Sequence, residues 1–360
     1  MIRLLLCFLL CGTVAHAQLL QAGFDKAEYL ELIKISARQG DSVYQGKIAR
    51  PRQSLFIYRS PVVGLDNRWD LWIKDKTTAV ISIRGTTANS VSWLANFYAA
   101  MVSARGQLTL ASGSTFNYNL ASNPRSAVHA GWLIAMACLA EDMQPRIDSL
   151  LQTGLRDVLI MGHSQGGAIA YLLTAYLYHR RMEGKLPADL RIKTYCSAGP
   201  KPGNLYFAYD YEAMTQQGNG WAFNVVNSAD WVPETPVSIQ TLNDFNATNP
   251  FKGAKKIANQ QPFPKNLALR YAINRMDKPT RRAQRNYQRF LGNMAAKMVS
   301  RQLAGYKAPP YVHSSDYVRC GHIIVLQADS LYYTRFPDDD RKVFIHHFFE
   351  PYFYLAERQL

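Results

Sequence analysis

The sequence predicts an α/β protein with a mostly parallel central sheet and helices on both faces. Apolar strand-like runs alternate with helical stretches, and several runs end in turn residues, at 84–86, 197–200 and 228–230. Alternation of this kind is typical of parallel sheets, whose carboxyl ends gather the reactive side chains. One run leads into the hexapeptide Gly-His-Ser-Gln-Gly-Gly at 162–167, which a helical stretch follows.

The remaining elements follow in order along the chain. Residues 25–39 have the apolar spacing of an amphipathic helix. Strand-like runs occupy 55–58, 69–73, 79–83, 158–161, 191–196 and 222–227, and residues 107–110 and 115–120 form a predicted hairpin. Long helices are expected from about 124 to 151, interrupted near Pro145, and over 168–179. Pro351 is expected in the first turn of the last helix.

The first residues have the features of an export signal. Arg3 precedes an apolar block at 4–10 and the small-x-small pattern at 15–17. Later residues lack the roughly 20 consecutive apolar residues that a membrane helix needs. We therefore predict a signal peptide over 1–17, a mature chain that begins at Gln18, and a periplasmic or secreted product.

The cysteines bear on the compartment and on cross-linking. Cys11 is an alternative lipid-attachment point, but the leucines before it lack the small residue that lipoprotein processing prefers. Removal of the signal would leave Cys138, Cys196 and Cys320, and an odd number excludes a fully paired framework. Buried thiols are favoured, and one disulfide stays open.

The net charge of +15 is concentrated in one segment. Residues 250–310 contain 14 Lys or Arg and one acid, Asp277. Residues from about 243 to 311 also break the rhythm of strands and helices, so we interpret them as a basic helical insertion into a single domain spanning 18–360. Asp277-Lys278-Pro279 predicts a helix start. That helix would run to about Leu303 and carry on one side Tyr287, Phe290, Leu291, Met294 and Met298.

Ser164 is the candidate nucleophile. An apolar run, a glycine-flanked serine and a helical stretch form a nucleophile elbow, in which a tight turn exposes the hydroxyl above the sheet. Tight turns of this kind also serve structure alone. Acyl transfer further requires a base, an acid that orients the base, and donors for an oxyanion.

Candidates exist for the acid and the base. Asp230 directly follows a strand-like run, although an Asp can also simply stabilise a turn there. His346 and His347 stand just before the last helix, and since neighbouring side chains point apart, only one of them is expected to face the serine. His163, beside the nucleophile, is expected to brace the elbow.

The predicted oxyanion donors come from two strand ends. One is the backbone N–H of Gln165, directly after the nucleophile. The other is Thr86, which could offer both its amide and its hydroxyl, unless residues 84–86 are an ordinary turn.

Taken together, these motifs resemble the class 3 lipases, the fungal-type branch of the α/β-hydrolases. The matching segments are 83–86, 92–96, 128–132, 162–167, 198–204 and 226–233. The resemblance implies a triad of Ser164, Asp230 and His347, because the family's base precedes an aromatic residue by a few positions; His346 is the alternative. Gln165 departs from the family's usual Leu, and the long separation of Asp230 from the C-terminal histidines departs from its compact members.

The resemblance implies an exported carboxylic-ester hydrolase, a lipase acting on acylglycerols with no metal or cofactor. A phospholipase A1 or a feruloyl or acetyl esterase is the alternative within enzymes, and an inactive binder of lipid or polyanions the alternative outside them. The expected partner is a lipid or other ester substrate, with no specific nucleic acid and an open oligomeric state. The basic insertion could dock on an anionic membrane surface, cover the acyl site, or be a solvated face.

Overall fold

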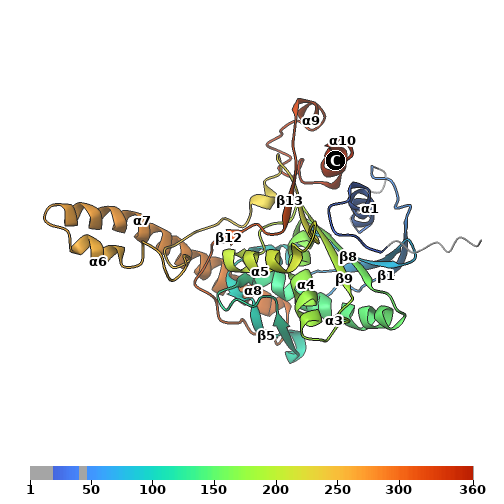
Figure 1. Ribbon diagram of the computed structural model, residues 1–360, viewed down its shortest axis with the longest axis horizontal. Coiled ribbons are helices and arrows are strands. Elements are labelled where there is room, and N and C mark those ends of the chain that lie inside the picture. The colour runs from blue at the N-terminus through green and yellow to red at the C-terminus, as the bar shows by residue number, and fades with distance from the viewer. Residues whose placement is uncertain (1–18, 40–46, 360) are drawn as a thin grey trace, which may run out of the picture.

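A seven-stranded, mostly parallel sheet forms the centre of the computed structural model (Figure 1), which describes residues 19–39 and 47–359. The predicted signal peptide, Gln18 and Cys11 lie outside the described residues. The strand order is β1-β2-β3-β8-β9-β11-β13, and β2 alone runs against its neighbours. The strands are β1 (Ser54–Arg59), β2 (Trp69–Lys74), β3 (Thr78–Ile83), β8 (Asp157–His163), β9 (Arg191–Ser197), β11 (Ala222–Asn227) and β13 (His322–Leu326).

Helices cover both faces of this sheet, as predicted. One face carries α1 (Lys26–Ser36) and α10 (Phe349–Gln359); the other carries α3 (Ala130–Gln152), α4 (Gln165–Met182) and α5 (Leu205–Thr215). Alternate residues of β8 serve the two cores, because Leu159 and Met161 pack with α1 and α10 whereas Val158 and Ile160 pack with α3 and α4. With both faces covered, β8 is buried along its whole length. The mostly parallel sheet, the helices on both of its faces and the sharp turn after β8 agree with the predicted α/β-hydrolase fold.

Smaller elements surround the sheet. A second sheet has the order β12-β10-β7-β4, and β5 and β6 form the predicted hairpin. The strands are β4 (Met101–Ser103), β5 (Arg105–Thr109), β6 (Thr115–Asn119), β7 (Ala127–His129), β10 (Gly203–Asn204) and β12 (Tyr317–Val318). Two further α-helices are α2 (Ser90–Phe97) and α9 (Ser330–Arg335). Two short 3₁₀ helices are η2 (Ala111–Gly113) and η3 (Val232–Glu234).

The helix expected from about 124 begins later. Residues 127–129 pair with β4 and β10, and α3 starts at Ala130 with His129 as its N-cap. The expected interruption is also absent, because Pro145 lies inside a continuous α3.

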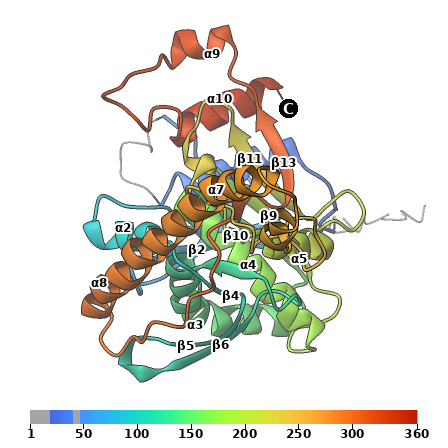
Figure 2. The ribbon, with the colours of Figure 1, turned by 90° about the vertical axis from the view of Figure 1, so that its left-hand side faces the viewer.

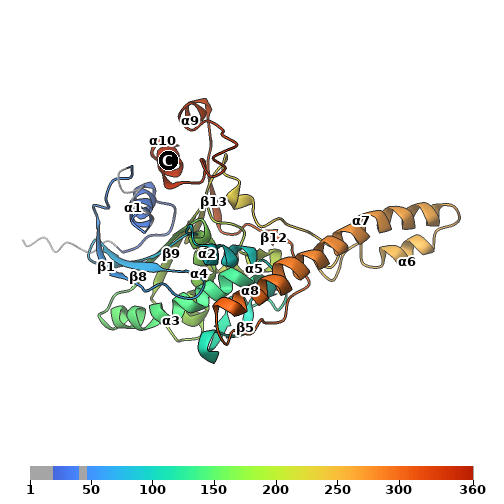
Figure 3. The same ribbon diagram turned by 180° about the vertical axis from the view of Figure 1, so that it is seen from behind.

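A long helical arm is the most unusual feature of the fold. Helix α6 (Ala254–Asn259) turns back into α7 (Lys265–Gln288), which continues through a π-helical turn, η4 (Arg289–Met294), into α8 (Ala295–Gln302). Figures 1 and 3 show α6 and most of α7 standing clear of the domain. The expected helix start at Asp277 is therefore wrong. Pro279 sits inside α7, and the Thr280 hydroxyl donates to the Asp277 carbonyl one turn earlier at 2.9 Å.

The face by which the arm docks also differs from the expected one. Phe290, Met294 and Met298 are exposed, although Tyr287 is buried as predicted. Small residues make the close contact instead: Gly292 lies so near Ala100 that a Cβ at Gly292 would be 2.9 Å from the Ala100 Cβ. The buried residues of this contact are Tyr287, Gly292, Ala295, Ala296 and Val299.

Two sequence questions are answered by the described residues. Cys138, Cys196 and Cys320 are buried free thiols, so the disulfide left open does not form among them. Within 19–39 and 47–359, none of the helices combines the length and apolarity that crossing a bilayer requires.

Candidate active site

Ser164 occupies the sharp turn between β8 and α4. Its backbone is in the left-handed region, with φ of 61°, which exposes the side chain at the carboxyl end of the sheet. Two glycines make the turn possible. A Cβ at Gly162 would lie 2.0 Å from the Gly166 carbonyl oxygen, and one at Gly166 would lie 2.3 Å from the Ile83 carbonyl oxygen. The glycine pattern that marked the elbow in the sequence is therefore a requirement of backbone packing.

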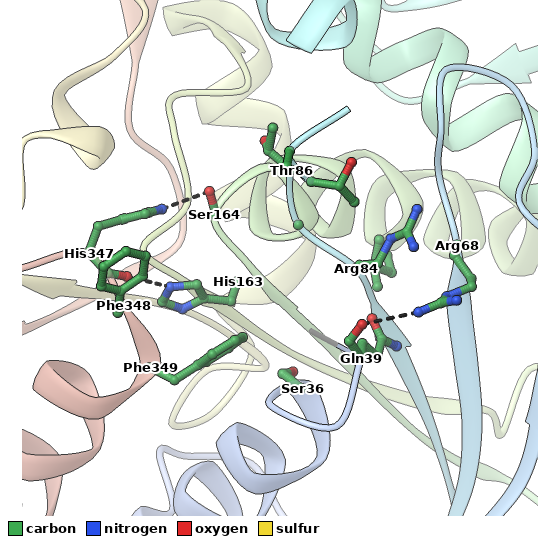
Figure 4. A pocket seen from close by; sticks show the side chains of 14 residues that line it. Ser36, Gln39, Arg68, Arg84, Thr86, His163, Ser164, His347, Phe348 and Phe349 are labelled. Atoms are coloured by element: carbon green, nitrogen blue, oxygen red, sulfur yellow. Dashed lines mark hydrogen bonds between the residues drawn. The ribbon is translucent and has the colours of Figure 1, made fainter. Parts of the chain in front are cut away.

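The structure brings Ser164, His347 and Asp230 into one hydrogen-bonded line. The Ser164 hydroxyl donates to His347 Nε2 at 2.7 Å, and His347 Nδ1–H donates to Asp230 Oδ2 at 2.8 Å. These residues come from the turn after β8, the turn after β11 and the loop before α10. Figure 4 shows His347 pointing to the Ser164 hydroxyl.

The Asp230 carboxylate is buried and held by further donors. The Val232 amide donates to Oδ1 at 3.0 Å, and the Tyr352 hydroxyl donates to Oδ2 at 2.7 Å. Burial, reinforced by the adjacent carboxylate, raises the pKa of Tyr352 well above its usual value, so the phenol remains a donor. The sequence alone assigns no role to Tyr352, because its contact with Asp230 joins residues 122 positions apart in the chain.

His163 braces the loop that carries His347. Its Nε2–H donates to the His347 carbonyl at 2.7 Å, so its Nδ1 accepts from the Ser197 hydroxyl at 3.0 Å. Burial lowers the pKa of His163 to about 3, and the ring therefore stays neutral in this role. His163 is expected from the sequence to brace the elbow, and its side chain joins the end of β8 to Ser197 and to the loop that carries His347.

His346 turns away from the serine. Its Nδ1 accepts from the Tyr332 hydroxyl at 2.8 Å, and its Nε2–H donates to the exposed Asp338 at 2.9 Å. The two adjacent histidines thus point to different partners, as expected for neighbouring side chains. Only His347 is placed within reach of Ser164.

The two predicted oxyanion donors, Thr86 and Gln165, lie near neighbouring strand ends. Gln165 is the first residue of α4, where amides have no partner within the helix. Thr86 follows β3, which pairs with β8 and so lies next to the elbow. Among the described residues, no acceptor takes the amide hydrogen of Thr86 or Gln165.

The Thr86 hydroxyl, in contrast, is already engaged. It donates to Gln165 Oε1 at 2.7 Å and accepts from Asn96 Nδ2 at 2.9 Å. The Asn96 side chain is in turn held by Trp132 Nε1 at 3.0 Å. The sequence suggested that Thr86 could offer both amide and hydroxyl, but in this conformation the hydroxyl proton is directed at Gln165.

His129 contacts both Asn96 and Trp132. Its Nε2–H donates to the Asn96 carbonyl at 3.2 Å, and its ring stacks on Trp132 with centroids 3.6 Å apart. Burial lowers the pKa of His129 to about 3. The imidazole is therefore a neutral structural group.

A cavity of about 380 Å³ opens beside Ser164 (Figure 4). Its walls include Thr86, His347 and Phe348, together with the half-buried Arg68 and Arg84. None of its lining comes from residues 243–311, so the basic segment does not cover the site in this conformation. In the part of the chain that the structure describes, His, Cys, Asp and Glu side chains form no group of three or more able to hold a metal ion.

Known proteins similar to this chain are lipases. Residues 80–239 match the family described as Lipase (class 3). A secreted mono- and diacylglycerol lipase of Fusarium solani is 30% identical over 171 residues, which are 45% of this chain and 48% of that protein. A lipase of Caenorhabditis elegans is 33% identical over 87 residues, or 24% of this chain and 22% of that protein. The chain thus spans about half the length of the first relative and less of the second.

One solved structure with a related fold is the triacylglyceride lipase of Rhizomucor miehei. It aligns with a TM-score of 0.45 and 21% identity, over 60% of this chain and 77% of that one. The matched residues 80–239 contain Thr86, Ser164 and Asp230. This segment of the chain is therefore similar to the class 3 lipases.

Proposed function

We propose that this protein is a serine carboxylic-ester hydrolase that cleaves lipid esters. The observation that carries the proposal is the hydrogen-bonded line from Ser164 through His347 to the buried Asp230. Such a line is the arrangement by which an imidazole base activates a serine and a carboxylate orients the imidazole. The match of residues 80–239 to the class 3 lipase family supports the same reaction.

The reaction follows from the positions of these groups. His347 Nε2 takes the Ser164 proton while Oγ attacks the ester carbonyl carbon, which gives a tetrahedral intermediate with a negative oxygen. The amides of Thr86 and Gln165 would donate to that oxygen. The protonated His347 then gives its proton to the leaving alkoxide, and an acyl-serine remains. Water, deprotonated by His347, attacks the acyl group and releases the acid with Ser164 restored.

We propose that the substrates are acylglycerols and that the protein is exported. The Fusarium relative is named as a secreted lipase of mono- and diacylglycerols, which supports both statements. We also propose one domain over residues 18–360, with the basic segment of residues 243–311 inserted in it. Glycerol esters gather at lipid–water interfaces, so an enzyme of this kind must approach a lipid surface to meet its substrate.

Hydrolysis of nitrophenyl esters from acetate to palmitate, by wild type and by Ser164→Ala, tests the proposal. We expect activity that rises toward the longer acyl chains and is lost in Ser164→Ala. Equal inactivity of both proteins on every ester would favour an inactive binding protein. A profile that peaks at acetate would favour an acetyl or feruloyl esterase, and release of fatty acid from phospholipid but not from acylglycerol would favour a phospholipase A1.

A further inference from the structure

The helical arm, residues 254–302, carries one continuous exposed face that changes from apolar to basic along its length. From the tip inward, residues spaced by three or four positions share one side of α7 and of the start of η4, as helical geometry requires. Near the tip these residues are apolar, and along the shaft they are basic. In order they are Leu267, Tyr271, Arg275, Lys278, Arg282, Arg285 and Arg289, and all seven are exposed. We call the last five the basic stripe.

The apolar tip is exposed to an unusual degree. Phe263, in the turn between α6 and α7, is 78% exposed, and Leu267 and Tyr271 are 53% and 63% exposed. Single exposed apolar side chains are ordinary on a protein surface, but a cluster of large ones marks an interaction site. Figure 1 shows the tip far from the rest of the molecule, so the domain itself does not cover it.

The basic stripe is not neutralised from within the arm. Asp277 is the one acidic residue of segment 250–310, and it is buried and accepts from Arg281 Nε at 2.7 Å. In the described part of the chain, no carboxylate forms an ion pair with any member of the stripe. Arg275 instead donates to the Tyr271 hydroxyl at 3.1 Å. The stripe therefore presents a row of cations to the solvent.

From this face we infer that the arm docks the protein on an anionic lipid bilayer. Large apolar side chains at the tip can enter the headgroup region, while the basic stripe lies against the lipid phosphates. A nucleic acid would be attracted by the same cations, but it offers nothing that buries Phe263 and Leu267. The inference rests on the proposed function in one respect, since a lipid substrate gives the docking its purpose.

The base of the arm connects this face to the wall of the active site. In the π-helical turn η4, the Leu291 carbonyl accepts from the Ala100 amide at 2.9 Å. Ala100 lies shortly after α2, the helix whose Asn96 donates to Thr86, and α2 also packs against α8. Figure 2 shows α8 beside α2. A bilayer held by the arm would therefore be fixed relative to the oxyanion side of the site.

Vesicle co-sedimentation tests the inference. Full-length protein is mixed with phosphatidylcholine vesicles that contain or lack phosphatidylglycerol, and the triple variant Lys278→Gln, Arg282→Gln, Arg285→Gln is compared with wild type. The matched control, Arg50→Gln, Arg52→Gln, Lys76→Gln, removes the same charges from exposed positions outside the arm. Circular dichroism melting checks that both variants are folded.

We expect wild type to prefer the anionic vesicles and the control to bind as wild type does. The stripe variant should bind on the order of 100-fold more weakly, since each Lys or Arg near an anionic surface contributes roughly a factor of five. Leu267→Ser with Tyr271→Ser should weaken the binding that persists at high salt. Each of these results supports docking.

Three results would overturn it: equal binding to both kinds of vesicle, equal loss in the stripe and control variants, or tighter binding of wild type to duplex DNA than to anionic vesicles. Ser164→Ala should bind vesicles as wild type does. Vesicle binding without Ser164-dependent ester hydrolysis would therefore refute the proposed function and leave the docking inference intact. Ser164-dependent ester hydrolysis without binding to anionic vesicles would refute the docking inference and leave the proposed function intact.

Discussion

The Tyr352 hydroxyl donates a 2.7 Å hydrogen bond to Asp230 Oδ2, the same oxygen that accepts from His347 Nδ1. Tyr352 lies in the first turn of α10, whereas Asp230 follows β11. The contact therefore joins the last helix to the carboxylate that holds His347, the proposed base. It also occupies a lone pair that would otherwise be buried without a partner.

Tyr352→Phe should consequently impair the reaction without removing any reacting group. Loss of one donor to the carboxylate weakens its hold on His347, and we expect kcat to fall by about tenfold with KM nearly unchanged. Initial rates on nitrophenyl butyrate measure both constants. The nearby Tyr354→Phe is a suitable control, because Tyr354 is half-buried and makes no contact with Asp230. An unchanged kcat in Tyr352→Phe would show that the Val232 amide and His347 alone are sufficient to fix the carboxylate.

The adjacent histidines offer a matched pair of substitutions. His347→Gln removes the base that contacts Ser164, and kcat should fall by on the order of 10⁴-fold or more. His346→Gln removes contacts with Tyr332 and Asp338 instead, so kcat should stay within about tenfold of wild type. Comparable losses in the two variants would contradict the assignment of His347 as the base, provided that their melting temperatures agree.

The sequence was informative where chemistry and local geometry coincide. Ser164 and Asp230 could be placed at the same sheet edge because both follow apolar runs and parallel strands end at one edge. The turn at Ser164 could be recognised because only glycine fits beside it. At these positions the backbone or the chemistry accepts few residue types, so the sequence pattern predicts where the residues lie in the fold.

Elsewhere, local signals were outweighed by contacts distant in the chain. Pro279 is a common helix-start residue, but it lies within a helix here because α7 continues into the docked η4 and α8. Strand β13 was missed, since its pairing with β11 spans the whole basic insertion. The bond between Thr86 and Gln165 depends on side-chain rotamers across two strand ends, which no spacing in the sequence specifies.

Because the Thr86 hydroxyl donates to Gln165 Oε1, we expect the effects of substitutions at positions 86 and 165 on kcat to depend on each other. Donation to an oxyanion would require its proton to leave Gln165 Oε1, which would then be a buried acceptor without a partner. In wild type we therefore expect Thr86→Val to lower kcat by less than about tenfold, with the amides stabilising the oxyanion. In a Gln165→Leu background the hydroxyl is released, and the same substitution should cost on the order of 10²-fold.

A double-mutant cycle on a soluble nitrophenyl ester measures this coupling. Thr86→Ser, which keeps the hydroxyl and removes the methyl group instead, controls for altered packing at position 86 in both backgrounds. If Thr86→Val had the same effect with Gln and with Leu at position 165, the hydroxyl would be independent of Gln165 and the prediction would fail.

The two buried histidines predict how stability depends on pH. Burial lowers the pKa of both His163 and His129 to about 3, whereas a histidine in an unfolded chain titrates near 6.5. Between these values the unfolded chain binds more protons than the folded protein, so the free energy of unfolding decreases as the pH falls below about 6.5. Each histidine can contribute a slope of up to about 1.4 kcal/mol per pH unit.

Urea denaturation at several pH values between neutral and mildly acidic measures that slope. His163→Gln should be less stable than wild type at neutral pH, because the bond to the His347 carbonyl is disturbed. Its stability should nevertheless fall less steeply on acidification, since one buried group that resists protonation is gone. Parallel pH profiles for wild type and His163→Gln would contradict the prediction, because His163 would then accept a proton as readily in the folded state as in the unfolded chain. The buried position of His163, between Ser197 and the His347 carbonyl, disfavours a charged ring.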